Sequence, residues 1–358
     1  MKKIISMILV LAMVLALAGC AGTTVVVNNY NYYGTDATTA TEPTETATTP
    51  VETEATEPVA AEGAIRTGLA IVTGLGAVDA SAEEEGNAEF AITLAAIMVD
   101  ENNVILDCEI DAIGHKFTFD STGAITSDLE AAVLTKNELG DDYGMVAIAH
   151  ATAEWYEQVD AFETYCIGKT IDEIQNGALT ESGYAADADL ATSATINLFD
   201  YVSALEAAYV NAQVLGAEAG DELVLSCTTS LADATQGNAQ LNVDAVALTT
   251  NGDGVITSCQ IDSLQGKATI DENGAVTDTN VNTKNALGYD YGMVSIAYAT
   301  YEWFEQAANF ASYITGKTAA EVAGIAIDEA TKPAEADLAT SVTISIYGFQ
   351  ALIAKALG

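Results

Sequence analysis

The sequence contains a long internal duplication. Residues 135–170 match residues 283–318 at an offset of 148 positions, and 23 of the 36 aligned residues are identical. The nine-residue segment 188–196 recurs at the same offset as 336–344, with a single difference between the two copies. A repeat period this long is typical of two similar domains and not of a solenoid built from short repeats. The duplication therefore restricts the fold to two related modules.

Each copy begins with strand-like runs and ends with helical patterns. The runs are separated by polar turn clusters such as 100–103 and 251–254, which predict an antiparallel meander. Large apolar side chains then recur at helical spacing from Trp155 in the first copy and from Trp303 in the second. We interpret these rows of apolar side chains as part of the hydrophobic core and not as the lining of a cofactor site. The expected fold class is α+β, in which each of two tandem modules places an antiparallel β-meander before its helices.

The two modules are expected at residues 63–213 and 214–358. A chain of 358 residues is long enough for two domains, and half of its residues are hydrophobic. Because each module has its own strands and helices, we expect each one to fold alone.

The N-terminal residues 1–20 have the composition of a secretory leader. Two lysines precede an apolar run that ends in Leu-Ala-Gly-Cys at Cys20. This ending resembles the bacterial lipobox, which implies that Cys20 is lipidated and becomes the mature N-terminus. Residues 21–62 are rich in Thr, Ala, Glu and Pro, which predicts a disordered acidic tether. We expect the protein at the outer face of the bacterial cytoplasmic membrane, attached to the membrane through the lipid on Cys20.

The charge balance excludes polyanionic partners. The chain has 52 acidic and 11 basic residues, which gives a formal net charge of −41. Nucleic acid would be repelled by this field, so we expect no nucleic-acid partner. Six lysines nevertheless occur at matching positions of the two copies. They are candidate partners for an anion or a carboxylate, although relief of charge repulsion also explains them: Lys116 and Lys267, Lys136 and Lys284, Lys169 and Lys317.

The remaining cysteines are Cys108, Cys166, Cys227 and Cys259. None of them forms a C-x-x-C motif, so the sequence has no signature of a dithiol redox centre or a metal site. Only Cys108 and Cys259 occupy equivalent places in the two copies. Because a duplicated disulfide would require two duplicated cysteines, buried free thiols are favoured.

Catalytic motifs are not evident. The two histidines, His115 and His150, lack metal-ligand spacing and are not repeated in the second copy. Residues 168–170 and 316–318 read Gly-Lys-Thr but lack the upstream glycine of a phosphate-binding loop. We interpret them as a helix stop followed by a capping box. A hydrolase is therefore the weakest functional class, and a carrier or binding module is favoured over an enzyme.

The duplicated segment carries a family resemblance. The pattern Asp189-x-x-Thr192-Ser193-Ala194-Thr195 is similar to the D-x-x-[ST]-G-A-[ST] signature of the FMN-binding domain of bacterial extracytoplasmic flavoproteins, with serine where the signature has glycine. In that family a flavin transferase joins the FMN phosphate to the last threonine. The resemblance implies two FMN-binding-domain-like modules whose cofactor residues are Asp189, Thr192 and Thr195 in the first copy, and Asp337, Thr340 and Thr343 in the second.

We expect this segment to open the last helix of each module. Free backbone amides at a helix N-terminus favour an anion, while ordinary N-capping by Asp189 and Thr192 explains the same residue types. Lys136 and Lys284 are the expected positive partners of a phosphate, with Lys169 as a further candidate. The function expected is flavin-dependent electron transfer with an unidentified redox partner. The alternative is a cofactor-free cell-surface binding or structural module on the same scaffold.

Overall fold

The computed structural model describes residues 24–27, 63–232 and 237–358. The predicted leader and Cys20 lie outside the described residues, as does most of the predicted tether. Four residues in this range are described, and they form a strand. Strand β1 (Thr24–Val27) pairs antiparallel with residues 74–77. Its β-branched valines favour extended backbone.

Two antiparallel sheets form the centre of the molecule. Each is a meander in which strands that follow one another in the sequence lie side by side. Polar turns separate the strands as predicted; at the turn after β3, the Asp100 side chain accepts hydrogen bonds from the Asn102 and Val104 backbone amides, both at 2.8 Å. The first sheet comprises β1, β2 (Arg66–Val78), β3 (Gly86–Val99) and β4 (Ile105–Phe119). The second comprises β5 (Glu222–Leu231), β6 (Asn238–Thr250), β7 (Ile256–Ile270) and β8 (Val276–Asn280).

Helices follow each sheet, which confirms the predicted α+β class. The predicted capping boxes are present: Thr170 caps α3 with Glu173, and Thr318 caps α8 with Glu321. The first set comprises α1 (Lys136–Leu139), the 3-10 helix η2 (Gly140–Tyr143), α2 (Trp155–Cys166), α3 (Ile171–Gly177), α4 (Leu190–Ser193) and α5 (Phe199–Val210). The second comprises α6 (Lys284–Leu287), η3 (Gly288–Tyr291), α7 (Trp303–Ile314), α8 (Ala319–Ala323), α9 (Ala336–Ala339) and α10 (Tyr347–Leu357). Among the described residues, no helix combines the length and apolar character needed to cross a bilayer.

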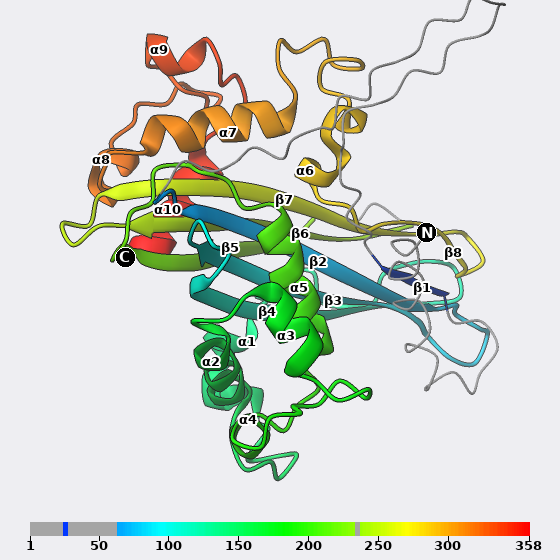
Figure 1. Ribbon diagram of the computed structural model, residues 1–358. Helices are drawn as coiled ribbons and strands as arrows, with labels where there is room; N and C mark the ends of the chain where they lie inside the picture. Colours follow the sequence, from blue (N-terminus) through cyan, green and yellow to red (C-terminus); the bar gives the residue numbers. More distant parts are fainter. Residues whose placement is uncertain (1–23, 28–62, 233–236) are drawn as a thin grey trace, which may run out of the picture.

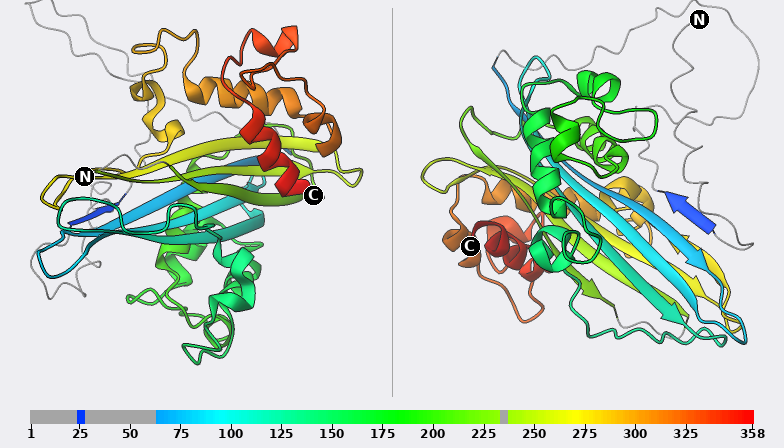
Figure 2. Two further views of the ribbon diagram at one scale, coloured as in Figure 1. Left: turned by 180° about the vertical axis from the view of Figure 1, so that it is seen from behind. Right: turned by 90° about the horizontal axis from the view of Figure 1, so that it is seen from below.

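The elements stack in four layers, with helices on both outer faces of the paired sheets (Figures 1 and 2). The inner faces of the two sheets share one apolar cluster, to which the first repeat contributes Phe90 and Leu94 and the second contributes Leu241 and Val243. A second cluster lies between the first sheet and helices α2 to α5. A third lies between the second sheet and helices α7 to α10. Each helical stripe therefore packs on its own sheet, as expected from the sequence.

The shared cluster changes the expectation that each module folds alone. An isolated repeat would expose the inner face of its sheet to water, including side chains that are now fully buried, such as Phe90 and Leu241. Burial of such side chains is the dominant stabilising term in folding. We therefore expect the two repeats to depend on one another.

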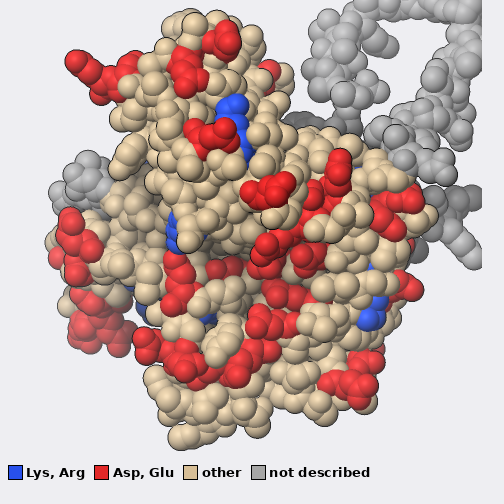
Figure 3. All heavy atoms as spheres, turned by 90° about the vertical axis from the view of Figure 1, so that its left-hand side faces the viewer, with Lys and Arg blue, Asp and Glu red and all other residues tan. Residues whose placement is uncertain are grey.

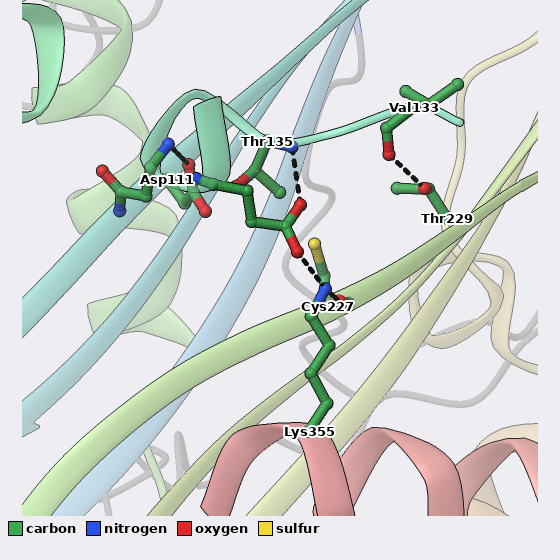
Figure 4. A network of polar contacts seen from close by, with 8 residues as sticks. Asp111, Val133, Thr135, Cys227, Thr229 and Lys355 are labelled. Carbon is green, nitrogen blue, oxygen red and sulfur yellow. Dashed lines mark hydrogen bonds and ion pairs between the residues drawn. The ribbon is translucent and has the colours of Figure 1, made fainter. Parts of the chain in front are cut away.

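Polar contacts also join the repeats (Figure 4). The Lys355 ammonium on α10 lies 2.5 Å from a Glu138 carboxylate oxygen on α1, and it donates to the Cys227 carbonyl at 2.6 Å. Nearby, the Thr229 hydroxyl donates to the Val133 carbonyl at 2.6 Å. Burial alone would raise the pKa of Glu138, but the bond and charge of Lys355 hold this pKa below its ordinary value. The last helix of the second repeat is thus fastened to the first repeat.

Candidate cofactor site

The duplicated segment does not open the last helix, so that prediction is wrong. Residues 190–193 form a helix of their own, α4, and α5 begins only at Phe199, after a link that starts with the extended Ala194. Asp189 makes no side-chain cap, and the Thr192 hydroxyl donates back to the Asp189 carbonyl at 2.8 Å. Thr340 repeats this bond to Asp337 at 3.0 Å. Threonine hydroxyls often bond the backbone three or four residues earlier, which competes with capping.

The last threonine of each segment is held by a buried glutamine. The Thr195 backbone amide and hydroxyl both donate to the Gln158 side-chain oxygen, at 2.8 and 3.0 Å. Thr343 makes the same two bonds to Gln306, at 2.7 and 3.0 Å. Both glutamines are fully buried, while both threonines are exposed. Each threonine hydroxyl directs its proton at the glutamine oxygen. The lone pairs of the threonine oxygen therefore point away from the glutamine.

Serine at the glycine position of the signature is accommodated without backbone strain. Ser193 does not have a positive φ angle, and neither does Ser341. The Ser193 hydroxyl folds back on its own turn and donates to the Asp189 and Leu190 carbonyls, at 3.3 Å each. The substituted side chain is therefore directed at its own helix and away from Thr195.

A shallow, open cavity of about 530 Å³ in the first repeat is lined by Ile196 and Asn197, the residues directly after Thr195. Its walls come from α1, η2, α2, the link after α4, and α5. The Lys136 ammonium lies 5.0 Å from the ring centres of both Tyr143 and Trp155, which is cation–π distance. The lining side chains include Lys136, Tyr143, Trp155, Ile196, Asn197 and Tyr201. The fold therefore brings Lys136 and the residues directly after Thr195 to one cavity.

Two polar groups adjust the electrostatics of this cavity. The Trp155 indole N–H donates to the Tyr201 hydroxyl at 2.8 Å, and burial raises the pKa of Tyr201 to about 12. Tyr201 is therefore a neutral hydroxyl at physiological pH. Burial also raises the pKa of Asp200, although the positive charge of Lys136 acts in the opposite direction. A lysine and a neutral hydroxyl suit a ligand that carries negative charge or hydrogen-bond acceptors.

The second repeat keeps the lysine but changes its neighbours. The Lys284 ammonium lies 4.7 Å from the Trp303 ring centre and 5.4 Å from that of Tyr291. Phe349 stands where the first repeat has Tyr201, and its ring centre lies 6.0 Å from that of Trp303. Burial lowers the pKa of Lys284, although two nearby carboxylates oppose this effect. The second site is therefore less polar than the first.

Several site residues were not predicted. Trp155 was assigned to core packing; it is buried, and it also lines the cavity. Gln158 and Gln306 were missed, although a polar residue repeated inside an apolar helical stripe was a usable signal. The Lys169 ammonium contacts the Tyr165 ring at 3.8 Å, and Lys169 does not line the cavity.

Acidic side chains gather where β4 lies beside α2, among them Glu109 and Glu163. On the face seen in Figure 3, acidic side chains far outnumber Lys and Arg. Burial raises the pKa of Glu163 to about 9, and nearby Glu109 and Asp160 add to this effect. Burial raises the pKa of Glu109 to about 7, with further contributions from carboxylates such as Asp107. In the part of the chain that the structure describes, no group of His, Cys, Asp and Glu side chains is placed to hold a metal ion.

Comparisons with known proteins give little guidance. No family model matches the chain, and no solved structure matches it. A segment of 42 residues, 12% of the chain, is 50% identical to chlorophenol reductase from Desulfitobacterium hafniense. The match spans 13% of that protein's length, and a similarity this short assigns no family.

Proposed function

We propose that the protein is an extracytoplasmic flavin carrier that transfers electrons, with one FMN on each repeat. The observation that carries the proposal is the exposed Thr195, held by Gln158 beside a cavity with a lysine and aromatic walls. The equivalent Thr343 is held by Gln306 in the same way. The resemblance of the duplicated segment to a flavinylation signature supports the same ligand.

The residues of the first site suit the parts of FMN. Thr195 presents an exposed hydroxyl oxygen that could carry the phosphate, and its position is fixed by the hydrogen bond that this hydroxyl donates to Gln158. Lys136 supplies positive charge, without which the field of a chain with net charge −41 would repel a phosphate. Tyr143 is exposed and offers an aromatic surface to a flat ring system, while the buried Trp155 forms the floor of the cavity. When bound, a flavin would supply one- and two-electron transfer that none of these side chains can perform.

The two sites would act separately. Helices α2 and α4 lie on one outer face of the paired sheets, and α7 and α9 lie on the opposite face (Figure 1). Both sheets therefore stand between the two sites, and stacked sheets are about 10 Å apart. We propose that each flavin exchanges electrons with partners on its own side of the molecule.

Attachment to the membrane through Cys20 completes the proposal. Replacing Cys20 with alanine should abolish labelling by a fatty acid analogue and release the protein from the membrane fraction. A Cys20→Ala variant that still takes up the label and stays with membranes would contradict a lipid anchor.

The flavin is tested by intact mass measurement on protein purified from its native host. The expected result is an FMN-sized mass increment at each occupied threonine. Thr195→Ala should remove one increment, and Thr343→Ala should remove the other. Thr180→Ala is the matched control, because Thr180 is also an exposed threonine but lies outside the duplicated segment. An unmodified mass for the wild-type protein would contradict the proposal, as would an increment that persists in the double variant lacking both Thr195 and Thr343.

A cofactor-free binding or structural module is the second candidate, and one observation favours it. Gln158 already satisfies both the amide and the hydroxyl of Thr195, so the threonine has a structural role without any ligand. Gln158→Leu separates the two candidates. For a structural module only the stability should fall, whereas for a flavin protein the mass increment at Thr195 should also fall in the chains that remain folded.

A further inference from the structure

Two cysteines meet in the outer core of the first repeat. Cys108 lies on β4 and Cys166 is the last residue of α2. Both are buried free thiols in this structure, as expected from the sequence, and the two side chains interact with each other. The Cys108 thiol also donates to the Glu163 carbonyl at 3.8 Å, one turn before Cys166. Cys166 is fully buried and Cys108 is 2% exposed. The pair therefore lies inside the apolar cluster that joins the helices to the sheet.

Backbone hydrogen bonds fix the approach of the two segments. The Ile105 amide donates to the Lys169 carbonyl at 2.8 Å, and the Gly168 amide donates to the Ile105 carbonyl at 2.8 Å. Ile105 lies three residues before Cys108, and Gly168 lies two residues after Cys166. These bonds hold the two backbone segments together close to the cysteines, and they do not depend on a flexible loop.

The second repeat provides a natural comparison. Ile256 makes the same pair of bonds to Gly316 and Lys317, at 2.8 and 2.9 Å. Cys259 occupies the place of Cys108, but Ile314 occupies the place of Cys166. The scaffold is therefore repeated, and only the first repeat holds both sulfur atoms.

We propose that Cys108 and Cys166 form a disulfide in the exported protein, an inference that rests on the extracytoplasmic location in the proposed function. In the reaction the two thiols lose two electrons and two protons to a disulfide-bearing oxidant. One S–S bond forms between Cys108 and Cys166, the S–S bond of the oxidant breaks, and the oxidant leaves as two thiols. Disulfides of this kind persist in oxidising compartments.

Burial determines when the bond forms and how long it lasts. Contact with Cys166 and burial raise the pKa of Cys108 well above its ordinary value, so the folded protein holds few thiolates. Because the thiolate is the reactive form, exchange takes place while the chain is still folding. Once buried, the bond is protected from reductants. It would tie α2, which carries Trp155 and Gln158, to the first sheet.

The test uses full-length protein from the membrane fraction of its host, with free thiols blocked at lysis. After denaturation without reductant, Cys227 and Cys259 are expected to react with a thiol reagent, while Cys108 and Cys166 are expected in one cross-linked peptide. The joined peptides should have lost the mass of two hydrogen atoms. Reaction of both Cys108 and Cys166 with the reagent, or pairing of either one with another cysteine, would overturn the proposal.

A second experiment distinguishes failure of the disulfide proposal from failure of the flavin proposal. Purified protein is unfolded, reduced and refolded with oxidised glutathione, which tests the pairing independently of location and of flavin. Cross-linking of Cys108 to Cys166 is expected here too. Ile314→Cys is the positive control, because the matching scaffold should then pair residue 314 with Cys259. If residue 314 and Cys259 formed a disulfide in this variant while Cys108 and Cys166 stayed reduced, the proposal would be overturned. A missing FMN mass increment in the same spectra would bear only on the flavin proposal.

Discussion

The packing of the two repeats against each other can be tested at one contact between the sheets. Gly266 on β7 is buried opposite Phe90 on β3. A β-carbon at position 266 would lie 2.9 Å from the Phe90 ring, and 3.3 Å from the Leu241 carbonyl oxygen. The Phe90 ring is fully buried and packs edge-on against Phe117, with ring centres 6.0 Å apart. The ring therefore has little room to move away from an added methyl group.

The expected cost of Gly266→Ala follows from this contact. Inserting a methyl group into a packed core typically costs about 1–3 kcal/mol. Phe90→Leu should itself destabilise by roughly 1–2 kcal/mol, less than the ~3–5 kcal/mol of a truncation to alanine. In the double variant the shorter leucine vacates space for the new methyl group. The double variant should thus be more stable than the sum of the single changes predicts, by at least about 0.5 kcal/mol.

The assay is equilibrium unfolding in urea, followed by tryptophan fluorescence. Gly114→Ala is the matched control, because Gly114 also lies in a strand but no atom lies within 4 Å of its added β-carbon. This control should be neutral or stabilising, by up to about 1 kcal/mol. If Gly266→Ala were as mild as Gly114→Ala, or if the cycle with Phe90→Leu were additive, the proposed contact between the sheets would be refuted.

Three further predictions concern the rest of the fold. Burial raises the pKa of Glu163 from 4.5 to about 9, so the folded chain keeps a proton that the unfolded chain releases, and stability should fall as pH rises through this window. Glu163→Gln should therefore increase the free energy of unfolding at pH 9, by up to about 6 kcal/mol at ~1.36 kcal/mol per pKa unit, and change it little at pH 4. Urea titrations at both pH values measure this difference, and a decrease at pH 9 would contradict the prediction. Gly68→Ala would place a β-carbon 2.0 Å from the Ala208 carbonyl oxygen, which should cost more than about 3 kcal/mol or prevent folding, as measured by circular dichroism. Fragments 63–213 and 214–358 expressed separately should aggregate or melt without cooperativity, and a soluble fragment with a sharp thermal transition would argue against the shared core.

The meanders and the helix caps could be predicted because their determinants are local. Asp100 accepts bonds within its own turn, and Thr170 bonds to Glu173 three residues later. The core that the two repeats share depends on contacts between residues far apart in the sequence. The continuous buried run from Ile92 to Val99 was nevertheless a signal, because a strand with both faces covered loses the alternation of apolar and polar residues. The sequence did not indicate that the second sheet is the layer that covers this strand.

The candidate site was predicted in part. The duplicated segment indicated Thr195 and the matched lysines of the two copies indicated Lys136, and the fold places Lys136 in the same cavity as the residues directly after Thr195. The position of Thr195 relative to a helix was wrong, because Ala194 is extended and ends α4 before α5 begins. Gln158, which holds the threonine, lies 37 residues earlier in the chain. Sequence spacing does not reveal a contact at that distance.

The central claim is tested most directly by the colour of protein purified from its native host and then denatured. If FMN is joined to Thr195 and Thr343, the denatured chain should remain yellow after precipitation and washing. Its flavin absorbance should then correspond to two flavins per chain. A colourless chain, or a chromophore that washes away completely, would contradict attachment at these threonines.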